Sequence, residues 1–154
     1  MKKEKTVNQP DSAGASVLQA VYKCGKMGSD SALSILKYAK TNDMKTDMTA
    51  ILDGYQKLSS SSAEKLMKMG VTPEEADMMT KLGSKVGMTM NTMIDSSNSH
   101  LAEMVIQGAN MGITDIQSCI NKYEDTACNK EYLEDAERTL RFNEKVIEDM
   151  KKYL

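Results

Sequence analysis

Apolar and small residues recur at steps of three and four along almost the whole chain, and this period restricts the possible folds more than any other feature. In the first stretch it joins Val17, Val21, Cys24, Gly28 and Ala32. Such steps place side chains on one face of an α-helix, whereas a half-buried strand needs strict alternation. The period predicts helices over residues 14–40, 44–69, 86–122 and 129–153. No segment alternates as a strand does, so we expect an all-α protein, an antiparallel four-helix bundle.

Short polar segments separate the predicted helices. A turn is expected at Thr41-Asn42-Asp43, and residues 123–128 connect the last two helices. Gly70 is expected to stop the second helix, because glycine readily takes the left-handed conformation found at helix ends. Residues 1–12 are polar and are expected to form a flexible N-terminal arm. Residues 13–154 are then a single helical-bundle domain.

The stretch from residue 73 to 122 keeps a helical pattern but is too long for one helix of such a bundle, since it would measure about 75 Å. Thr72-Pro73-Glu74-Glu75 has the pattern of a capping box, which predicts a short crossover helix over 73–82. We place the interruption at Gly83–Gly87. The alternative is Asp95–Ser99, whose side chains compete for backbone hydrogen bonds, and it leads to a five-helix bundle.

The composition argues against several classes of partner. No apolar signal segment follows the basic N-terminus, and no apolar run reaches the ~20 residues that span a bilayer, so no membrane is expected as a partner. Cys24, Cys119 and Cys128 are odd in number and lack a CxxC spacing, which is typical of reduced thiols in a cytoplasmic protein. Residues 1–70 hold 11 basic and 7 acidic side chains, but no basic stripe with interleaved aromatics occurs, so no nucleic acid is expected.

Glycines recur on the predicted inner faces of the helices. Gly83 and Gly87 form one GxxxG pattern, and Gly108 and Gly112 form another. Glycine inside a helix costs about 1 kcal/mol relative to alanine, so a pair in mid-helix indicates close approach to the backbone. We interpret the second pair as tight helix contact, with room for a small-molecule ligand beside Gly108 and Gly112 as the alternative.

The chain contains 14 methionines, which we interpret mainly as flexible core filler. A Met-rich surface for a partner helix is the second interpretation. Met88, Met90 and Met93 form the densest cluster and raise the question of a thioether site for Cu(I). Met88 lies off the helix face that the other two share, so the three do not converge without a partner segment.

His100 is the sole histidine, and Glu103 lies on the same helix surface at i+3. Glu137 and Glu144 on the last predicted helix are the carboxylates that would complete a metal site there. One histidine is too few for a His-rich zinc site. The chain has no GxSxG, GxxxxGK[ST] or GxGxxG motif. We therefore expect no catalytic residues and no cofactor, with His100, Glu103 and Glu144 kept only as metal-ligand candidates.

Several stretches of the chain together resemble a known group of proteins. They are Gly87–Thr92, Ser99–Gly108, Met111–Ile113, Phe142–Glu144 and Met150–Leu154. These stretches resemble uncharacterised bacterial proteins with a ferritin-like four-helix bundle. The resemblance covers most of residues 16–154 and implies four main helices with a crossover between the second and the third.

The chain departs from the ferritin-like pattern at the metal ligands. Di-iron proteins of this kind take a Glu from each of two helices and Glu-x-x-His from each of the other two. Here Ser97 stands three residues before His100, and the first two helices offer Asp30 and Asp53 without a second histidine. The di-iron ligand set is therefore absent, and iron storage and oxygen chemistry are not expected.

These observations predict a non-enzymatic structural or interaction protein that self-associates as a homo-oligomer. The alternative is a metal-binding ferritin-like protein with a degenerate site around His100 and Glu103.

Overall fold

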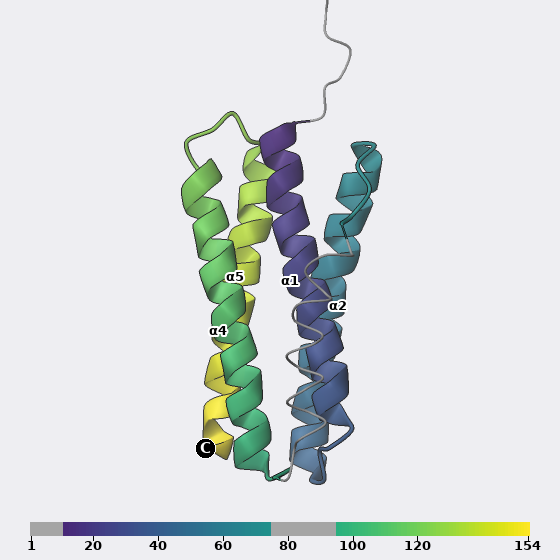
Figure 1. The fold of residues 1–154 in the computed structure, drawn as a ribbon, viewed down its shortest axis with the longest axis vertical. Helices are drawn as coiled ribbons and strands as arrows, with labels where there is room; N and C mark the ends of the chain where they lie inside the picture. Colours follow the sequence, from purple (N-terminus) through teal and green to yellow (C-terminus); the bar gives the residue numbers. More distant parts are fainter. Residues whose placement is uncertain (1–10, 75–94) are drawn as a thin grey trace, which may run out of the picture.

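The computed structural model describes residues 11–74 and 95–154 of the chain (Figure 1). These ranges form α1 (Ser12–Leu36), α2 (Asn42–Lys68), α4 (Asn98–Tyr123) and α5 (Lys130–Met150), followed by the short 3-10 helix η1 (Lys151–Tyr153). No strand occurs in these ranges, so the prediction of an all-α four-helix bundle is confirmed. None of the helices described combines the length and the apolar character that crossing a membrane requires.

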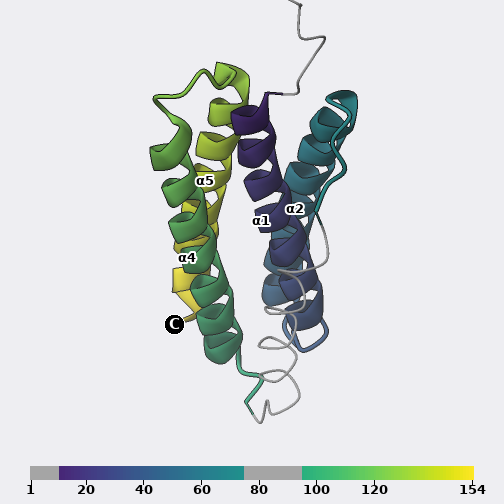
Figure 2. The same ribbon diagram turned by 45° about the horizontal axis from the view of Figure 1, so that its top comes forward.

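The α1 helix lies between α2 on one side and the α4–α5 hairpin on the other, in both views of the ribbon (Figures 1 and 2). Short loops join α1 to α2 and α4 to α5, so each pair is antiparallel. The α1–α2 loop, the start of α4 and the C-terminus lie at one end of the bundle, and the α4–α5 loop lies at the other (Figure 1). α1 packs against all three other helices, whereas α2 touches α5 at only a few points.

The first helix begins slightly earlier than expected because Asp11 caps it. Asp11 Oδ1 accepts a hydrogen bond from the backbone N–H of Gly14 at 2.8 Å, and its Oδ2 accepts one from the N–H of Asn129 at 3.2 Å. Asp11 and Ser12 therefore belong to the folded part of the chain and not to the arm expected over residues 1–12. Residues 1–10 lie outside the described part of the structure.

The third predicted helix, expected to run without a break from residue 86 to 122, is wrong at its start. Residues 95–97 are not helical, and α4 begins at Asn98. Ser97 caps this helix by accepting a hydrogen bond from the N–H of His100, while Asp95 accepts one from the N–H of Ser97. Short polar side chains thus take the backbone donors that a continuing helix would need. The chain is therefore interrupted within Asp95–Ser99, the alternative position, while Gly83–Gly87 lies outside the described residues.

The chain leaving α2 turns back onto α1. Gly70 has a φ of +74°, which confirms it as the helix stop. Thr72, Pro73 and Glu74 follow in a non-helical conformation. The crossover helix expected over 73–82 therefore does not include its first two residues, and the remainder lies outside the described ranges.

The core consists of apolar clusters along the bundle, and its tightest helix contact is that of α1 with α2. A Cβ on Gly25 would lie 2.7 Å from the backbone nitrogen of Ser59 and 2.8 Å from the backbone oxygen of Tyr55. Gly54 likewise gives room to the ring of Phe142 on α5, which meets the Tyr55 ring edge-on at 4.9 Å between centroids. At Gly25 only glycine permits the approach, because the backbone atoms of α2 cannot move aside as a flexible side chain can.

We predict that Gly25→Ala lowers the free energy of unfolding by about 2 kcal/mol or more, since the added methyl group forces α1 away from α2. Gly108→Ala is the matched control, because a Cβ there meets no described atom within 4 Å. It should leave stability unchanged or raise it by up to about 1 kcal/mol. Urea denaturation followed by circular dichroism measures both changes, and equal effects at the two positions would contradict this packing.

Candidate functional site

An apolar groove of about 810 Å³ runs between α1 and α4. Ala20, Cys24 and Met27 line it from α1, and Met104 and Met111 line it from α4. The groove exists because small side chains occupy much of its walls. These small residues are Ala15, Ala20, Gly28 and Ala32 on α1 and Gly108, Ala109 and Gly112 on α4.

The two glycines of the Gly108–Gly112 pattern have different surroundings in the structure. A Cβ on Gly112 would lie 2.8 Å from Oδ1 of Asn143, so this glycine serves close contact between α4 and α5. A Cβ on Gly108 would meet nothing within 4 Å among the described residues, and Gly108 lines the groove. Each of the two interpretations made from the sequence therefore describes one glycine: tight packing at Gly112 and free space at Gly108.

A buried polar network lies at the deepest part of the groove. The hydroxyl of Tyr55 donates to Oδ1 of Asn143 at 2.7 Å. The amide nitrogen of Asn143 donates to the backbone oxygen of Thr139 at 2.9 Å and to Sγ of Cys24 at 3.4 Å. One asparagine on α5 thereby connects α2 and α1, and its amide group is satisfied although Asn143 is only 1% exposed.

The groups of this network are held in their neutral forms. Burial raises the pKa of the Cys24 thiol; the hydrogen bond from Asn143 opposes this, and the charge of Asp115 adds to it. Burial also raises the pKa of Tyr55 well above its usual range, with a further contribution from Cys24. A reactive cysteine needs a lowered pKa, so Cys24 lacks the character of a nucleophile. The network holds helices together and carries no group activated for catalysis.

The metal-ligand candidates are only partly brought together. Nδ1 of His100 lies 3.7 Å from a carboxylate oxygen of Glu103 on the outer side of α4, and both side chains are substantially solvent-accessible. Glu144 does not join them, because no three His, Cys, Asp or Glu side chains gather into a possible metal site within residues 11–74 and 95–154. Met88, Met90 and Met93 lie outside those ranges. No observation on the described residues favours the metal-binding alternative.

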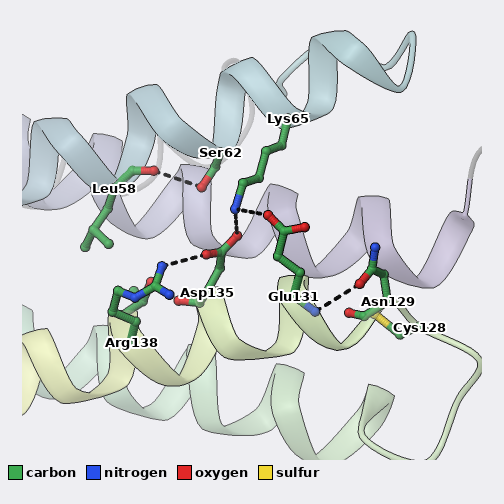
Figure 3. Close-up of polar contacts among 9 residues, drawn as sticks. Leu58, Ser62, Lys65, Cys128, Asn129, Glu131, Asp135 and Arg138 are labelled. Atoms are coloured by element: carbon green, nitrogen blue, oxygen red, sulfur yellow. Dashed lines mark hydrogen bonds and ion pairs between the residues drawn. The ribbon is translucent and has the colours of Figure 1, made fainter.

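A second polar cluster joins α2 to α5 near the α4–α5 loop (Figure 3). Nζ of Lys65 on α2 pairs with Oδ2 of Asp135 and, at 3.0 Å, with Oε1 of Glu131. Arg138 binds the other oxygen of Asp135 at 2.8 Å. The Asp135 side chain is only 8% exposed, and Lys65 and Arg138 offset the cost of burying its carboxylate. This cluster joins the last turns of α2 to the first turns of α5.

The sequence analysis identified neither the pair of Tyr55 and Asn143 nor the pair of Lys65 and Asp135. The available signal was the position of polar residues on otherwise apolar helix faces. Asp135 directly precedes the buried Ala136, and Asn143 continues the same stripe. A buried polar residue needs a partner, although the sequence alone does not indicate which one.

Comparison with protein-family models, with curated proteins and with solved structures finds no match to this chain. The resemblance to ferritin-like bacterial proteins therefore stays a prediction, and the function has to be argued from the groove and its surroundings.

We predict that Tyr55 and Asn143 are energetically coupled. Asn143→Leu leaves the buried Tyr55 hydroxyl without its acceptor and should cost about 2–3 kcal/mol of stability. Tyr55→Phe should cost about 1–2 kcal/mol, because Asn143 keeps its other two contacts. The loss of stability in the double variant should be at least about 1 kcal/mol smaller than the sum of the two single losses. Denaturation of the four proteins measures this, and strictly additive losses would refute the coupling.

We predict that Asp135→Asn lowers stability by about 1–3 kcal/mol, because Lys65 loses its main partner. Burial disfavours the charged lysine, but its hydrogen bonds to Asp135 and Glu131 outweigh this and raise the pKa of Lys65. A folded-state pKa above the unfolded value means that the stabilisation is complete below the ordinary lysine pKa and is lost as pH rises through the folded one.

The difference between Asp135→Asn and the parent protein should therefore hold at neutral pH and shrink in strongly alkaline solution. Asp53→Asn is the control, because it breaks the exposed pair of Asp53 and Lys57 and should change little. Denaturation curves at several pH values test this. A difference that grows with alkaline pH would contradict the assignment.

Proposed function

We propose that this protein is a non-enzymatic interaction protein of the cytoplasm that self-associates, with the α1–α4 groove as the surface that receives an apolar helix. The observation that carries the proposal is the groove itself, which has a volume of about 810 Å³ and walls that are largely apolar. Met111 on its wall is 42% exposed, which is high for a large apolar side chain. A hollow with mostly apolar walls is typical of binding sites.

The character of the lining favours a helix over a small polar substrate. Sites for small molecules combine apolar walls with a few polar groups that converge on the ligand. In this groove the deepest polar groups, Tyr55 and Asn143, already bond to each other, and Gln19 and Lys23 bond to residues 72–74. Met27, Met104 and Met111 are flexible and adapt to the side chains of a helix, as Met-rich grooves do.

A second copy of the chain is the partner that we propose for this groove. The helices of this protein carry the apolar faces that such a groove accepts, and homo-oligomers are the commonest assemblies. Nucleic acid and membrane are not part of the proposal.

We predict that Met111→Glu weakens self-association at least tenfold, or about 1.4 kcal/mol, because it places a charge on the groove wall. Met67→Glu is the matched control, since Met67 is a 68% exposed methionine on α2 that does not line the groove. Size-exclusion chromatography with light scattering over a concentration series measures the association. A parent protein that stays monomeric at the highest concentration, or equal effects of the two substitutions, would contradict the proposal.

A further inference from the structure

We propose that the helix received by the α1–α4 groove is α4 of the second copy, so that two α4 helices pack antiparallel about a two-fold axis at Met111. The inference rests on the proposed function, that the groove binds a helix of a second copy, and it names that helix and its register. Three observations lead to it: the lack of charge on the outer face of α4, the spacing of its groove-lining residues, and the free space beside Gly108.

The outer face of α4 carries almost no charge. Within α4, which the structure describes throughout, nine residues between positions 107 and 121 are exposed, and Asp115 is the one charged residue among them. The other eight are Gln107, Gly108, Asn110, Met111, Thr114, Gln117, Ser118 and Asn121. Charged side chains normally cover surfaces that face water, and they are depleted at the centre of protein interfaces. The outer face of α4 therefore has the composition of an interface.

The outer face of α5 shows the opposite composition. All ten exposed residues of this helix, which is likewise described throughout, are charged. The two helices lie side by side in the same bundle (Figure 1), so the difference is not a property of the chain as a whole. It marks the α4 side of the molecule as the side that another protein covers.

A second copy of the chain suits this neutral face. In a contact about a two-fold axis, each residue close to the axis lies near its own counterpart. A charged side chain would meet a like charge there, which is unfavourable. Glutamine, asparagine and threonine both donate and accept hydrogen bonds, so each can pair with itself. The outer face of α4 is thus self-complementary, whereas the charged face of α5 is not.

The residues of α4 that line the groove place the axis at Met111. Side chains at steps of three and four form one stripe along a helix. Met111 lies in the middle of such a stripe and is 42% exposed. A Cβ on Gly108 would meet no described atom within 4 Å, so a second helix can approach α4 closely at this level. The partner's Met111 then enters the groove. The stripe consists of Met104, Gln107, Met111, Asp115 and Ser118.

The antiparallel register supplies a partner for Asp115. Burial raises the pKa of its carboxyl, and no hydrogen bond or cation among the described residues opposes this. Gln107 lies four residues before Met111 and Asp115 lies four residues after it, so an axis at Met111 places Gln107 opposite the partner's Asp115. The amide of Gln107 then donates to that carboxylate, and the same contact occurs twice.

The charges of the two Asp115 side chains do not prevent this contact. In this register they are about 12 Å apart along the helix axis, from eight residues at the rise of an α-helix. Solvent-exposed charges separated by more than about 8 Å are largely screened at physiological ionic strength. The single charged residue of the face is therefore compatible with its pairing with itself.

Cross-linking at position 111 tests the position of the axis in the full chain. Cys24→Ala, Cys119→Ser and Cys128→Ala remove the native thiols. Met111→Cys then places one thiol of each copy at the axis, and Glu137→Cys places one on the exposed face of α5 as control. With a short bismaleimide we expect Met111→Cys to give at least about ten times more covalent dimer than Glu137→Cys on a denaturing gel. Equal yields, or no covalent dimer for Met111→Cys, would overturn the proposal.

A charge exchange in the native cysteine background tests the register. Gln107→Glu places a carboxylate opposite the partner's Asp115 and should weaken self-association at least about tenfold, measured by light scattering over a concentration series. Adding Asp115→Gln exchanges the two side chains and should restore the association. Gln56→Glu adds the same charge to an exposed glutamine of α2 that does not line the groove, and it should change nothing. Equal effects of Gln107→Glu and Gln56→Glu, or no recovery in the exchanged variant, would show that this register is wrong.

The proposed function and the named helix fail in different ways. If the parent protein self-associates and Met111→Glu prevents it, but Met111→Cys gives no covalent dimer, the groove receives another helix, and only the further inference is wrong. If the parent protein stays monomeric at the highest concentration, the proposed function is wrong and the pairing of α4 with itself is wrong too.

Discussion

The hydrogen-bonded contact of Tyr55, Asn143 and Cys24 joins α1, α2 and α5 in the interior, and the shape of the groove depends on it. Because these polar groups satisfy one another, the helices meet there without leaving a buried donor or acceptor unpaired. Gly112 allows α4 to approach the same asparagine. These three side chains therefore form the floor of the groove. The small residues of α1 and α4 that line its sides leave it wide.

Interactions near the ends of the bundle complete the arrangement. Asp11 connects the start of α1 to the loop before α5, and Lys65 with Asp135 attaches the far end of α2 to α5. Gln19 and Lys23 then hold the chain that leaves α2 against α1. Each of these contacts joins segments far apart in sequence. Together they hold the helix ends and residues 72–74 in place around the apolar groove, which relates the fold to the proposed function.

The helical period was enough to predict the fold class and, to within a few residues, the helices at 12–36, 42–68 and 130–150. It failed at residues 95–97, because the apolar stripe stays in phase across Ser97 while the side chains there take over the backbone hydrogen bonds. The sequence indicated either free space or close helix contact at Gly108 and Gly112. Only the positions of the neighbouring helices show that Gly112 is in close contact and that Gly108 borders free space. The pairings of Tyr55 with Asn143 and of Lys65 with Asp135 depend on tertiary distances, which no local pattern carries.

The central claim is that the α1–α4 groove binds an apolar helix of a second copy of the chain. Amide hydrogen exchange of the protein at low and high concentration, followed by mass spectrometry of peptides from α1 and α4, tests this most directly. We expect exchange in both helices to slow as the concentration rises, because a bound second copy covers the groove. Exchange rates that do not depend on concentration would contradict the claim.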